Sequence, residues 1–398
     1  MVVGGGYWQL FMVQKARAMG LRTVVIDGNS NAPCRAHADT FHQVNALDGE
    51  RAAEVARREG VRGVTTFGTN DAIITVAHVH HALALPGDCI LPEVARRAVF
   101  KDTMRDCLRA HRVPVPRGWL LHLSEPAFDA MVAGYLDEVA HPLICKPTDT
   151  SGGKGITIIA TPPEIPAARA TAARESRNGL VLLEEYFGYH TLGVESFTCD
   201  GQTTVVAIAD KFLSPPPHCV TRGVITPSGV PDHIQQRVRE VNRQALAALG
   251  ISSGPSHIDM VLDEQGEPHV IDVGPRLAGG PITIEIIPAV WQVPLMEHTI
   301  RAALGERQPV APVWSGRYAC SWHFTSPRTG VIRAFEIQET VRRQFRCTHL
   351  HYWRRPGAHV TPAVDSSQLL GFCVCEGDTF SQAVANVRGL EDAMILDF

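Results

Sequence analysis

Apolar and polar positions alternate along residues 1–98 in short blocks that predict strands followed by helices. An apolar pair, Val2-Val3, leads into three glycines at 4–6, and a helix is expected to follow to about Met19. Further strands are expected at 22–27 and 61–67, and a helix follows the second of them. Strand–helix alternation predicts a parallel, doubly wound sheet. No glycine stands at the third position of a dinucleotide fingerprint, so a glycine turn at the sheet edge explains the triplet better.

A different pattern begins near residue 99. A helix opens at Lys101 and ends before the prolines at 114 and 116, which cannot continue it. A small α+β subdomain is expected over about 116–189. Within it, an apolar strand ends at Lys146 and a glycine-rich loop follows at 151–155. Glycines let backbone N–H groups approach a phosphate, and a buried lysine beside them adds a point charge. A surface hairpin is the alternative for the loop taken alone.

Two further segments show clear periodicity. Apolar residues at helical spacing predict an amphipathic helix over 231–249, and they read as core contacts. The apolar strand 180–183 runs into Glu184 and Glu185. These two acids suit the rim of a nucleotide base or ribose, and solvated charges at a strand end are the alternative.

Residues 256–276 predict a hairpin with two opposed carboxylates. If Gln265-Gly266 forms a two-residue turn, Asp259 lies directly opposite Asp272, with Cβ atoms about 4.5–5.5 Å apart. Ile258, Met260 and Leu262 would then share the core face with Ile271 and Val273. Opposed carboxylates repel unless a cation lies between them, and their hard oxygens suit Mg²⁺ shared with phosphates. Arg276 continues the same face, where its guanidinium could hold a carboxylate or a phosphate.

Composition narrows the class of protein. Lys plus Arg is 37 against 41 for Asp plus Glu in 398 residues, which favours two or three domains without a basic nucleic-acid surface or a membrane-binding helix. The ten cysteines are scattered, so reduced thiols and a cytoplasmic location are expected. The first residues predict neither a signal peptide nor a membrane span.

Taken together, these segments resemble the ATP-grasp superfamily over most of the chain. The resemblance implies an α/β and α+β fold with three parts: a Rossmann-like pre-ATP-grasp domain (1–98), an ATP-grasp domain (99–304) with a lid subdomain at about 116–189, and a C-terminal α+β domain (305–398). It implies ATP and Mg²⁺, with Mn²⁺ as a substitute, as cofactors. Asp259 and Asp272 match the metal ligands. The expected nucleotide contacts are Lys101, Lys146, Ser151, Gly152, Gly153, Lys154, Gly155, Glu184, Glu185, Tyr186, Phe187, His190 and Lys211.

The sequence around Arg276 departs from the family in an informative way. Gly274 replaces a frequent asparagine ligand, aspartates stand where the family prefers glutamates, and Thr191 stands near a frequent ribose-binding glutamate. The form of 272–280, with a glycine pair after the arginine, resembles the L-amino acid ligase branch, as does the segment 370–378. The expected substrate contacts are Arg276, Gly279, Gly280, His218 and Glu195, with Arg276, Lys146, Gly279 and Gly280 in catalysis.

The resemblance implies an ATP-dependent carboxylate–amine ligase that forms an amide through an acyl phosphate and releases ADP and phosphate. Its expected partners are a small carboxylate, such as an amino acid, and an amine, and the sequence is compatible with a homodimer. Two alternatives stay open at this point. One is a carboxylase that activates bicarbonate as carboxyphosphate, and the other is an ATP-binding protein without catalysis.

Overall fold

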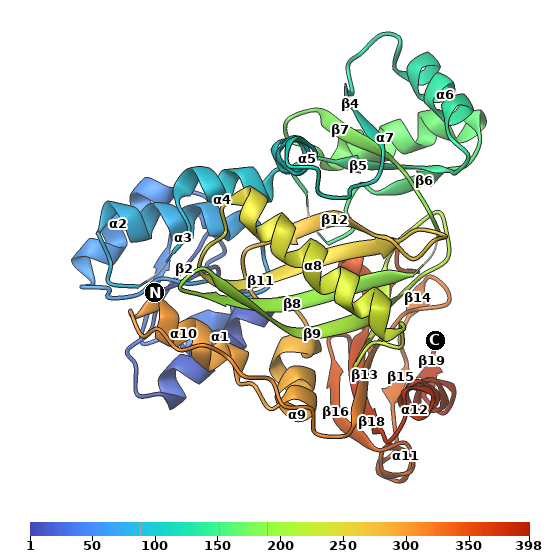
Figure 1. The fold of residues 1–398 in the computed structure, drawn as a ribbon. Helices are drawn as coiled ribbons and strands as arrows, with labels where there is room; N and C mark the ends of the chain where they lie inside the picture. The colour runs from blue at the N-terminus through green and yellow to red at the C-terminus, as the bar shows by residue number, and fades with distance from the viewer. Residues whose placement is uncertain (88, 151, 189) are drawn as a thin grey trace.

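The structure, a computed structural model, describes residues 1–87, 89–150, 152–188 and 190–398 (Figure 1). Its N-terminal part has a parallel sheet in the order β1-β2-β3, formed by Val2–Val3, Val24–Asp27 and Thr40–Gln43. The strand predicted at 61–67 is reduced to a single parallel bridge between Val2 and Thr65. The helices of this part are α1 (Tyr7–Ala18), α2 (Gly49–Arg58), α3 (Asp71–Ala82) and α4 (Pro92–Val99).

A four-stranded antiparallel sheet forms the lid subdomain, which projects from the rest of the molecule (Figure 1). Its order is β4-β7-β5-β6, from Gly118–His122, Leu180–Glu185, Leu143–Pro147 and Thr157–Ile159. Helices α6 (Phe128–Glu138) and α7 (Ile165–Glu175) pack on it through a small core of their own. Helix α5 (Lys101–Ala110) precedes this subdomain and lies at its base.

The centre of the molecule is an eight-stranded antiparallel sheet in the order β12-β11-β8-β9-β10-β13-β18-β16. Its strands from β8 to β12 precede residue 275, whereas β13, β18 and β16 follow residue 305. The pairing of β10 with β13 therefore carries one sheet across the predicted domain boundary. The strands are β8 (Thr191–Cys199), β9 (Gln202–Leu213), β10 (Thr221–Thr226), β11 (Gly254–Leu262), β12 (Pro268–Gly274), β13 (Tyr318–Phe324), β16 (Cys347–Tyr352) and β18 (Gly371–Gly377).

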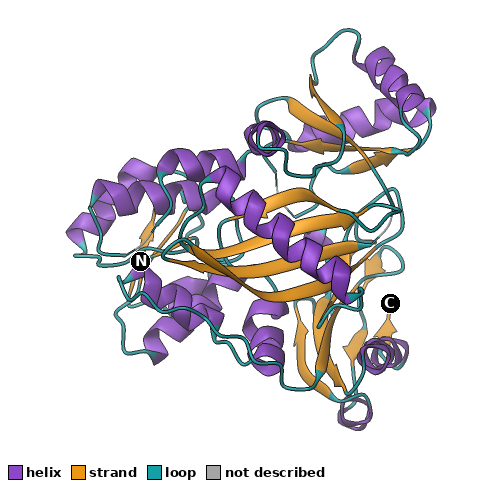
Figure 2. Cartoon of the chain, viewed as in Figure 1, coloured by secondary structure: helices purple, strands orange, loops and turns teal. Residues whose placement is uncertain are grey.

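Helices cover both faces of this sheet (Figure 2). The predicted amphipathic helix is α8 (Asp232–Leu249), which closes at Gly250 with φ 81° and packs Val238 and Val241 against Ile258 and Val270. Helix α12 (Phe380–Asp392) packs on the same sheet beside Trp322 and Cys373. The other elements are a π-helix (Ile282–Ile286), α9 (Ile287–Trp291), α10 (Leu295–Ala303), α11 (Glu339–Gln344), β14 (Gly330–Val331), β15 (Ala334–Glu336), β17 (His359–Val360) and β19 (Ile395–Asp397).

The hairpin of β11 and β12 has the predicted pairing of Asp259 with Asp272, although two features differ from the prediction. The turn is longer, because Asp263 and Glu267 still pair and Gly266 takes a φ of 81°. A β-bulge between Asp259 and Met260 then shifts the register by one residue and restores the expected alignment. The bulge also turns Ile271 out of the core and puts Val270 there instead, so the prediction for Ile271 is wrong.

In the part of the chain that the structure describes, no helix is both long and apolar enough to cross a bilayer.

Candidate active site

The predicted lysine at the end of β5 lies in a closed network of charges. Lys146 and Arg105 both form ion pairs with Glu184, and all three side chains are almost completely buried. Burial lowers the pKa of Lys146 and of Arg105, and the carboxylate of Glu184 opposes both shifts. The side chain of Glu184 therefore positions two cations inside the protein. The alternative of a solvated charge at this strand end is therefore wrong for Glu184, whereas its contact with the nucleotide stays a prediction.

Arg105 connects this network to the carboxylate hairpin. Its guanidinium donates to the carbonyl oxygens of Val270 and Ile271, directly before Asp272 in β12. The sequence analysis missed Arg105, although it lies four residues after Lys101 on the same helix and so shares its face. One side chain therefore contacts both Glu184 of the lysine network and the backbone that carries Asp272.

Lys101 reaches the glycine-rich loop. Its buried ammonium donates to the carbonyl oxygen of Thr150 at 2.6 Å, at the start of that loop. Gly152, Gly153 and Gly155 have φ values of 72°, 83° and 73°, which side-chain-bearing residues rarely adopt. Lys154 is exposed, and its carbonyl accepts a hydrogen bond from the Thr150 hydroxyl. Ser151 lies outside the described residues.

The segment predicted to contact adenine follows β7. The N–H groups of Glu185 and Tyr186 already donate to the carbonyls of Arg117 and Pro142, at 2.9 and 2.7 Å. The ring of Phe187 packs edge-on against His269. His190 forms an ion pair with Asp210 at 3.2 Å, and this hydrogen bond raises the pKa of the imidazole. Two N–H groups of this segment thus already have hydrogen-bond partners within the chain.

Asp259 lies in a chain of ion pairs that joins side chains of β8, β9 and β11. Its Oδ1 contacts Lys211 Nζ at 2.8 Å and His257 Nε2 at 3.0 Å, and His257 Nδ1 contacts Glu195 Oε1 at 2.5 Å. Burial lowers the pKa of His257, but the two carboxylates outweigh burial and raise it to about 9. Burial raises the pKa of Asp259, but Lys211 and His257 outweigh it and hold that pKa well below its usual range. Lys211 and His257 therefore supply positive charge that the opposed carboxylates were predicted to need from a metal.

Asp272 and Arg276 differ, because these half-buried side chains each have a shielded atom without a hydrogen bond. Among the residues that the structure describes, Asp272 Oδ1, Glu195 Oε2 and Arg276 Nε are shielded from water and form no hydrogen bond. Burial lowers the pKa of Arg276, and Asp272, Glu195 and Asp259 oppose that shift. An anionic oxygen and a guanidinium nitrogen without partners suit a site that a cation and an anionic substrate would complete.

The glycine pair that follows Arg276 has two different environments. Gly279 packs on Gly68 of the N-terminal part, and a Cβ on Gly279 would lie 3.2 Å from the Cα of Gly68. Gly280 has a φ of 98°, and no described atom lies within 4 Å of the place of its missing Cβ. Gly280 thus leaves room for a ligand, whereas Gly279 permits close packing. The carbonyl oxygen of His218, another expected substrate contact, accepts a hydrogen bond from Ser214 Oγ at 2.7 Å.

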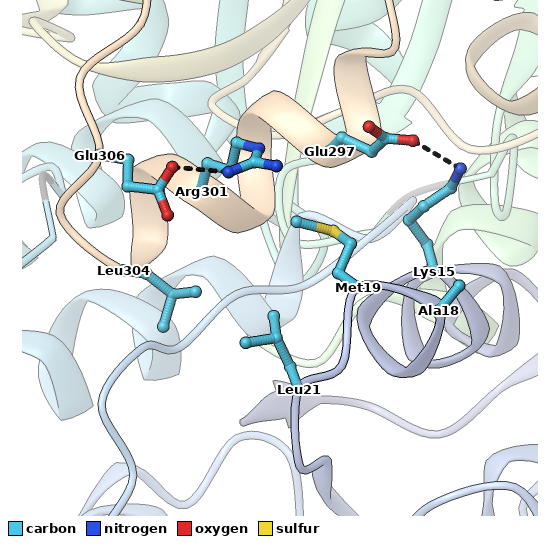
Figure 3. Close-up of a pocket in the computed structure, with 8 residues that line it drawn as sticks. All are labelled: Lys15, Ala18, Met19, Leu21, Glu297, Arg301, Leu304 and Glu306. Carbon is cyan, nitrogen blue, oxygen red and sulfur yellow. Dashed lines mark hydrogen bonds and ion pairs between the residues drawn. The ribbon is translucent and has the colours of Figure 1, made fainter.

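A pocket of about 370 Å³ lies elsewhere, between α1 and α10 (Figure 3). Its charged residues form ion pairs with each other, Lys15 with Glu297 and Arg301 with Glu306, both at 2.8 Å.

The described residues contain no group of three or more His, Cys, Asp or Glu side chains arranged to hold a metal. A cation would therefore depend on Asp272, the carboxylate with a free oxygen, and on oxygens from outside this set.

Comparison with known proteins adds two family matches. Residues 139–284 match the ATP-grasp domain, and residues 322–393 match the L-amino acid ligase C-terminal domain 2. The chain therefore carries an ATP-grasp domain at residues 139–284. The match to the second family agrees with the predicted L-amino acid ligase-like branch, and the predicted fold class is confirmed.

Three proteins that the chain resembles are 21–26% identical to it. An uncharacterized protein of Sinorhizobium fredii, y4rH, is 26% identical over 353 residues, which cover 87% of this chain and 70% of that protein. A formate-dependent phosphoribosylglycinamide formyltransferase of Salmonella arizonae is 25% identical over 63% of this chain and 62% of its own length. The structure of an L-amino acid ligase from Bacillus licheniformis superposes with a TM-score of 0.81 at 21% identity, over 100% of this chain and 98% of that one. This last likeness shows a shared fold.

Proposed function

We propose that this ATP-grasp protein is an ATP-dependent ligase that joins a small carboxylate, such as an amino acid, to an amine. The supporting observation is the position of Arg105, which contacts both Glu184 beside Lys146 and the backbone next to Asp272. Arg105 thus lies between two sets of residues. On one side are the lysines suited to bind phosphates, and on the other is the pair of Asp272 and Arg276, which suits a substrate. Phosphoryl transfer to a carboxylate requires such positioning and charge neutralisation.

In this proposal Lys101 and Lys146 bind the ATP phosphates, and the N–H groups of residues 152–155 cover them. Arg276 holds the substrate carboxylate so that one of its oxygens attacks the γ-phosphorus. The bond from that phosphorus to the β–γ bridging oxygen breaks, which gives an acyl phosphate and ADP. A neutral amine then attacks the carbonyl carbon, phosphate leaves, and the amine releases one proton as the amide forms. Closure of the loop excludes water from the acyl phosphate.

A divalent cation fits the site at Asp272, because that carboxylate has a buried oxygen with no hydrogen bond in the described structure. Asp259 faces it in register, although its Oδ1 contacts Lys211 and His257. Mg²⁺, or Mn²⁺ in its place, would neutralise charge that develops on the transferred phosphoryl group.

A phosphate-release screen tests the proposed function. The protein is incubated with ATP, Mg²⁺ and pairs of amino acids and small carboxylic acids, with and without bicarbonate. The masses of the products are then measured by mass spectrometry. We expect phosphate release that requires a carboxylate and an amine, with a product lighter than the sum of the two by one water. Phosphate release that requires bicarbonate would instead indicate a carboxylase, and ATP binding without turnover on any pair would indicate a binding protein.

We also propose a cytoplasmic location, because all ten cysteines are free thiols. A homodimer stays a prediction, and analytical ultracentrifugation of the purified chain tests it.

A further inference from the structure

Asn70 begins helix α3 but does not act as its cap. An asparagine at this position normally accepts a hydrogen bond from a backbone N–H in the first turn of the helix. The side chain of Asn70 forms no such bond, although it is only 3% exposed. Within the described chain its Oδ1 is shielded from water and has no hydrogen-bond partner. A buried carbonyl oxygen without a donor is costly, so its direction is informative.

That oxygen lies against Gly274. A Cβ built on Gly274 would lie 2.6 Å from Asn70 Oδ1, and 2.9 and 3.1 Å from Cζ and Nε of Arg276. The carboxamide of Asn70 therefore fills the space that a side chain at position 274 would occupy. Position 274 is where the resemblance to ATP-grasp proteins implies an asparagine ligand. The N-terminal part of this chain thus brings an asparagine amide to the place where its own β12 has none.

The nearest part of β12 supplies a second oxygen. Asp272 and Gly274 are two residues apart, so they lie on the same face of the strand. Asp272 Oδ1, like Asn70 Oδ1, is buried and unbonded among the described residues. The opposed carboxylate, Asp259, contacts Lys211 and His257 through its Oδ1. Two buried acceptors without donors, one of them anionic, favour a hard cation with oxygen ligands.

We propose that Asn70 Oδ1 is a ligand of the divalent cation together with Asp272, so that the N-terminal domain supplies the amide oxygen that Gly274 lacks. This inference rests on the proposed function, because the cation is the one that accompanies ATP. It adds a ligand from outside the ATP-grasp domain, and it links cation binding to the contact between loop 68–71 and residues 274–280. The direct hydrogen bond from Gly68 N to Leu277 O, at 3.4 Å, belongs to that contact.

The test measures Mn²⁺ binding to the complex of full-length protein and ADP by electron paramagnetic resonance, and it does not depend on turnover. We expect Asn70→Ala to weaken Mn²⁺ binding about tenfold or more, as loss of a group that supports a metal does elsewhere. Asn70→Asp keeps an oxygen and should retain binding. Thr69→Ala, one residue earlier in the same loop, is the matched control and should bind as the wild type does.

Moving the asparagine gives a sharper test. In Asn70→Ala/Gly274→Asn the amide leaves position 70, which opens space for a side chain at 274. The next two nearest atoms belong to the flexible end of Arg276. We expect this double variant to recover most of the Mn²⁺ affinity that Asn70→Ala loses. Thermal unfolding without metal or nucleotide shows whether each variant is folded.

The outcomes separate this inference from the proposed function. If the wild-type protein binds ADP, but Mn²⁺ binds the protein–ADP complex no more tightly than it binds free ADP, the proposed cation site as a whole is overturned. Normal Mn²⁺ binding by folded Asn70→Ala would overturn the role of Asn70 alone. If that variant also had a raised KM for the carboxylate substrate, Asn70 would act by holding Arg276.

Discussion

Two charged regions lie on either side of Arg105, one buried around Lys146 and one half-buried around Asp272, and they differ in how their charges are paired. Around Lys146 every charge has an opposite charge beside it, since Glu184 contacts Lys146 and Arg105 together. Buried polar atoms without hydrogen bonds occur in both regions, but among the described residues Asp272 and Arg276 also form no ion pair. In the first region one carboxylate holds two cations in place, and the surplus positive charge suits the proposed binding of ATP phosphates. In the second region the unpaired groups suit the proposed binding of a cation and a carboxylate.

The largest effect is expected from Glu184→Gln. This change leaves two buried cations without an anion, which typically costs about 3–5 kcal/mol. We therefore expect a large fall in the free energy of unfolding, measured with urea. Asp272→Asn is the matched variant on the other side, and it should abolish turnover while the free energy of unfolding stays the same or rises. If both variants lost stability equally, the contrast between the two regions would be wrong.

Protonated His257 is expected to add about 3 kcal/mol to the free energy of unfolding, because its pKa differs between the folded and unfolded states. Its folded pKa of about 9 lies above the unfolded value of about 6.5. The stabilisation is therefore fully present below about pH 6.5 and is lost as the pH rises through 9. Unfolding temperatures from pH 6 to pH 10 measure this loss, and His257→Gln should flatten the curve. An unchanged slope in that variant would assign the pH dependence to other groups.

Arg276→Lys should lower kcat/KM about a hundredfold, or about 2.7 kcal/mol, because the ammonium keeps the charge but cannot form the bidentate contact. ATP affinity, measured by calorimetry, should change far less. Normal turnover at saturating ATP together with lost ATP binding would place Arg276 in the nucleotide site.

The smallest effect concerns the glycine-rich loop, where Gly152 O accepts hydrogen bonds from Ser366 N at 3.4 Å and Ser366 Oγ at 3.1 Å. We expect hydrogen exchange at residues 152–155 to slow when an ATP analogue binds. Ser366→Ala removes one of these bonds, worth about 1 kcal/mol, and should speed exchange slightly without nucleotide. Equal exchange with and without the analogue would contradict a lid.

The sequence alone was sufficient to predict those elements whose structure is decided by local patterns. Helix 232–249 and the strand that ends at Lys146 follow from periodicity alone. The alignment of Asp259 with Asp272 was right because a longer turn and a bulge cancel each other. The same bulge made the prediction for Ile271 wrong, since nothing in the local sequence marks it.

The partners of the site residues were much harder to predict. His257 lies two residues before Asp259 on one strand, so the period of two could have revealed it. The burial of Glu184 depends on Arg105 from another element, and only the fold brings them together. Asn70 stands at a helix start, where an asparagine usually has a capping role, so its local sequence favours a different interpretation.

The two chain segments that join the lid subdomain to the rest of the molecule also run side by side. The incoming segment passes Pro114 and Arg117, and the outgoing one begins at Glu185, whose N–H donates to the carbonyl of Arg117. Pro114 in turn accepts from Val270 N, so this crossing is fastened to the strand that carries Asp272. Arg105 adds a third link, because it joins Glu184 of the subdomain to the carbonyl oxygens of the same strand. The base of the subdomain is thus anchored to β12, and this anchor sets where Lys146 stands relative to Asp272.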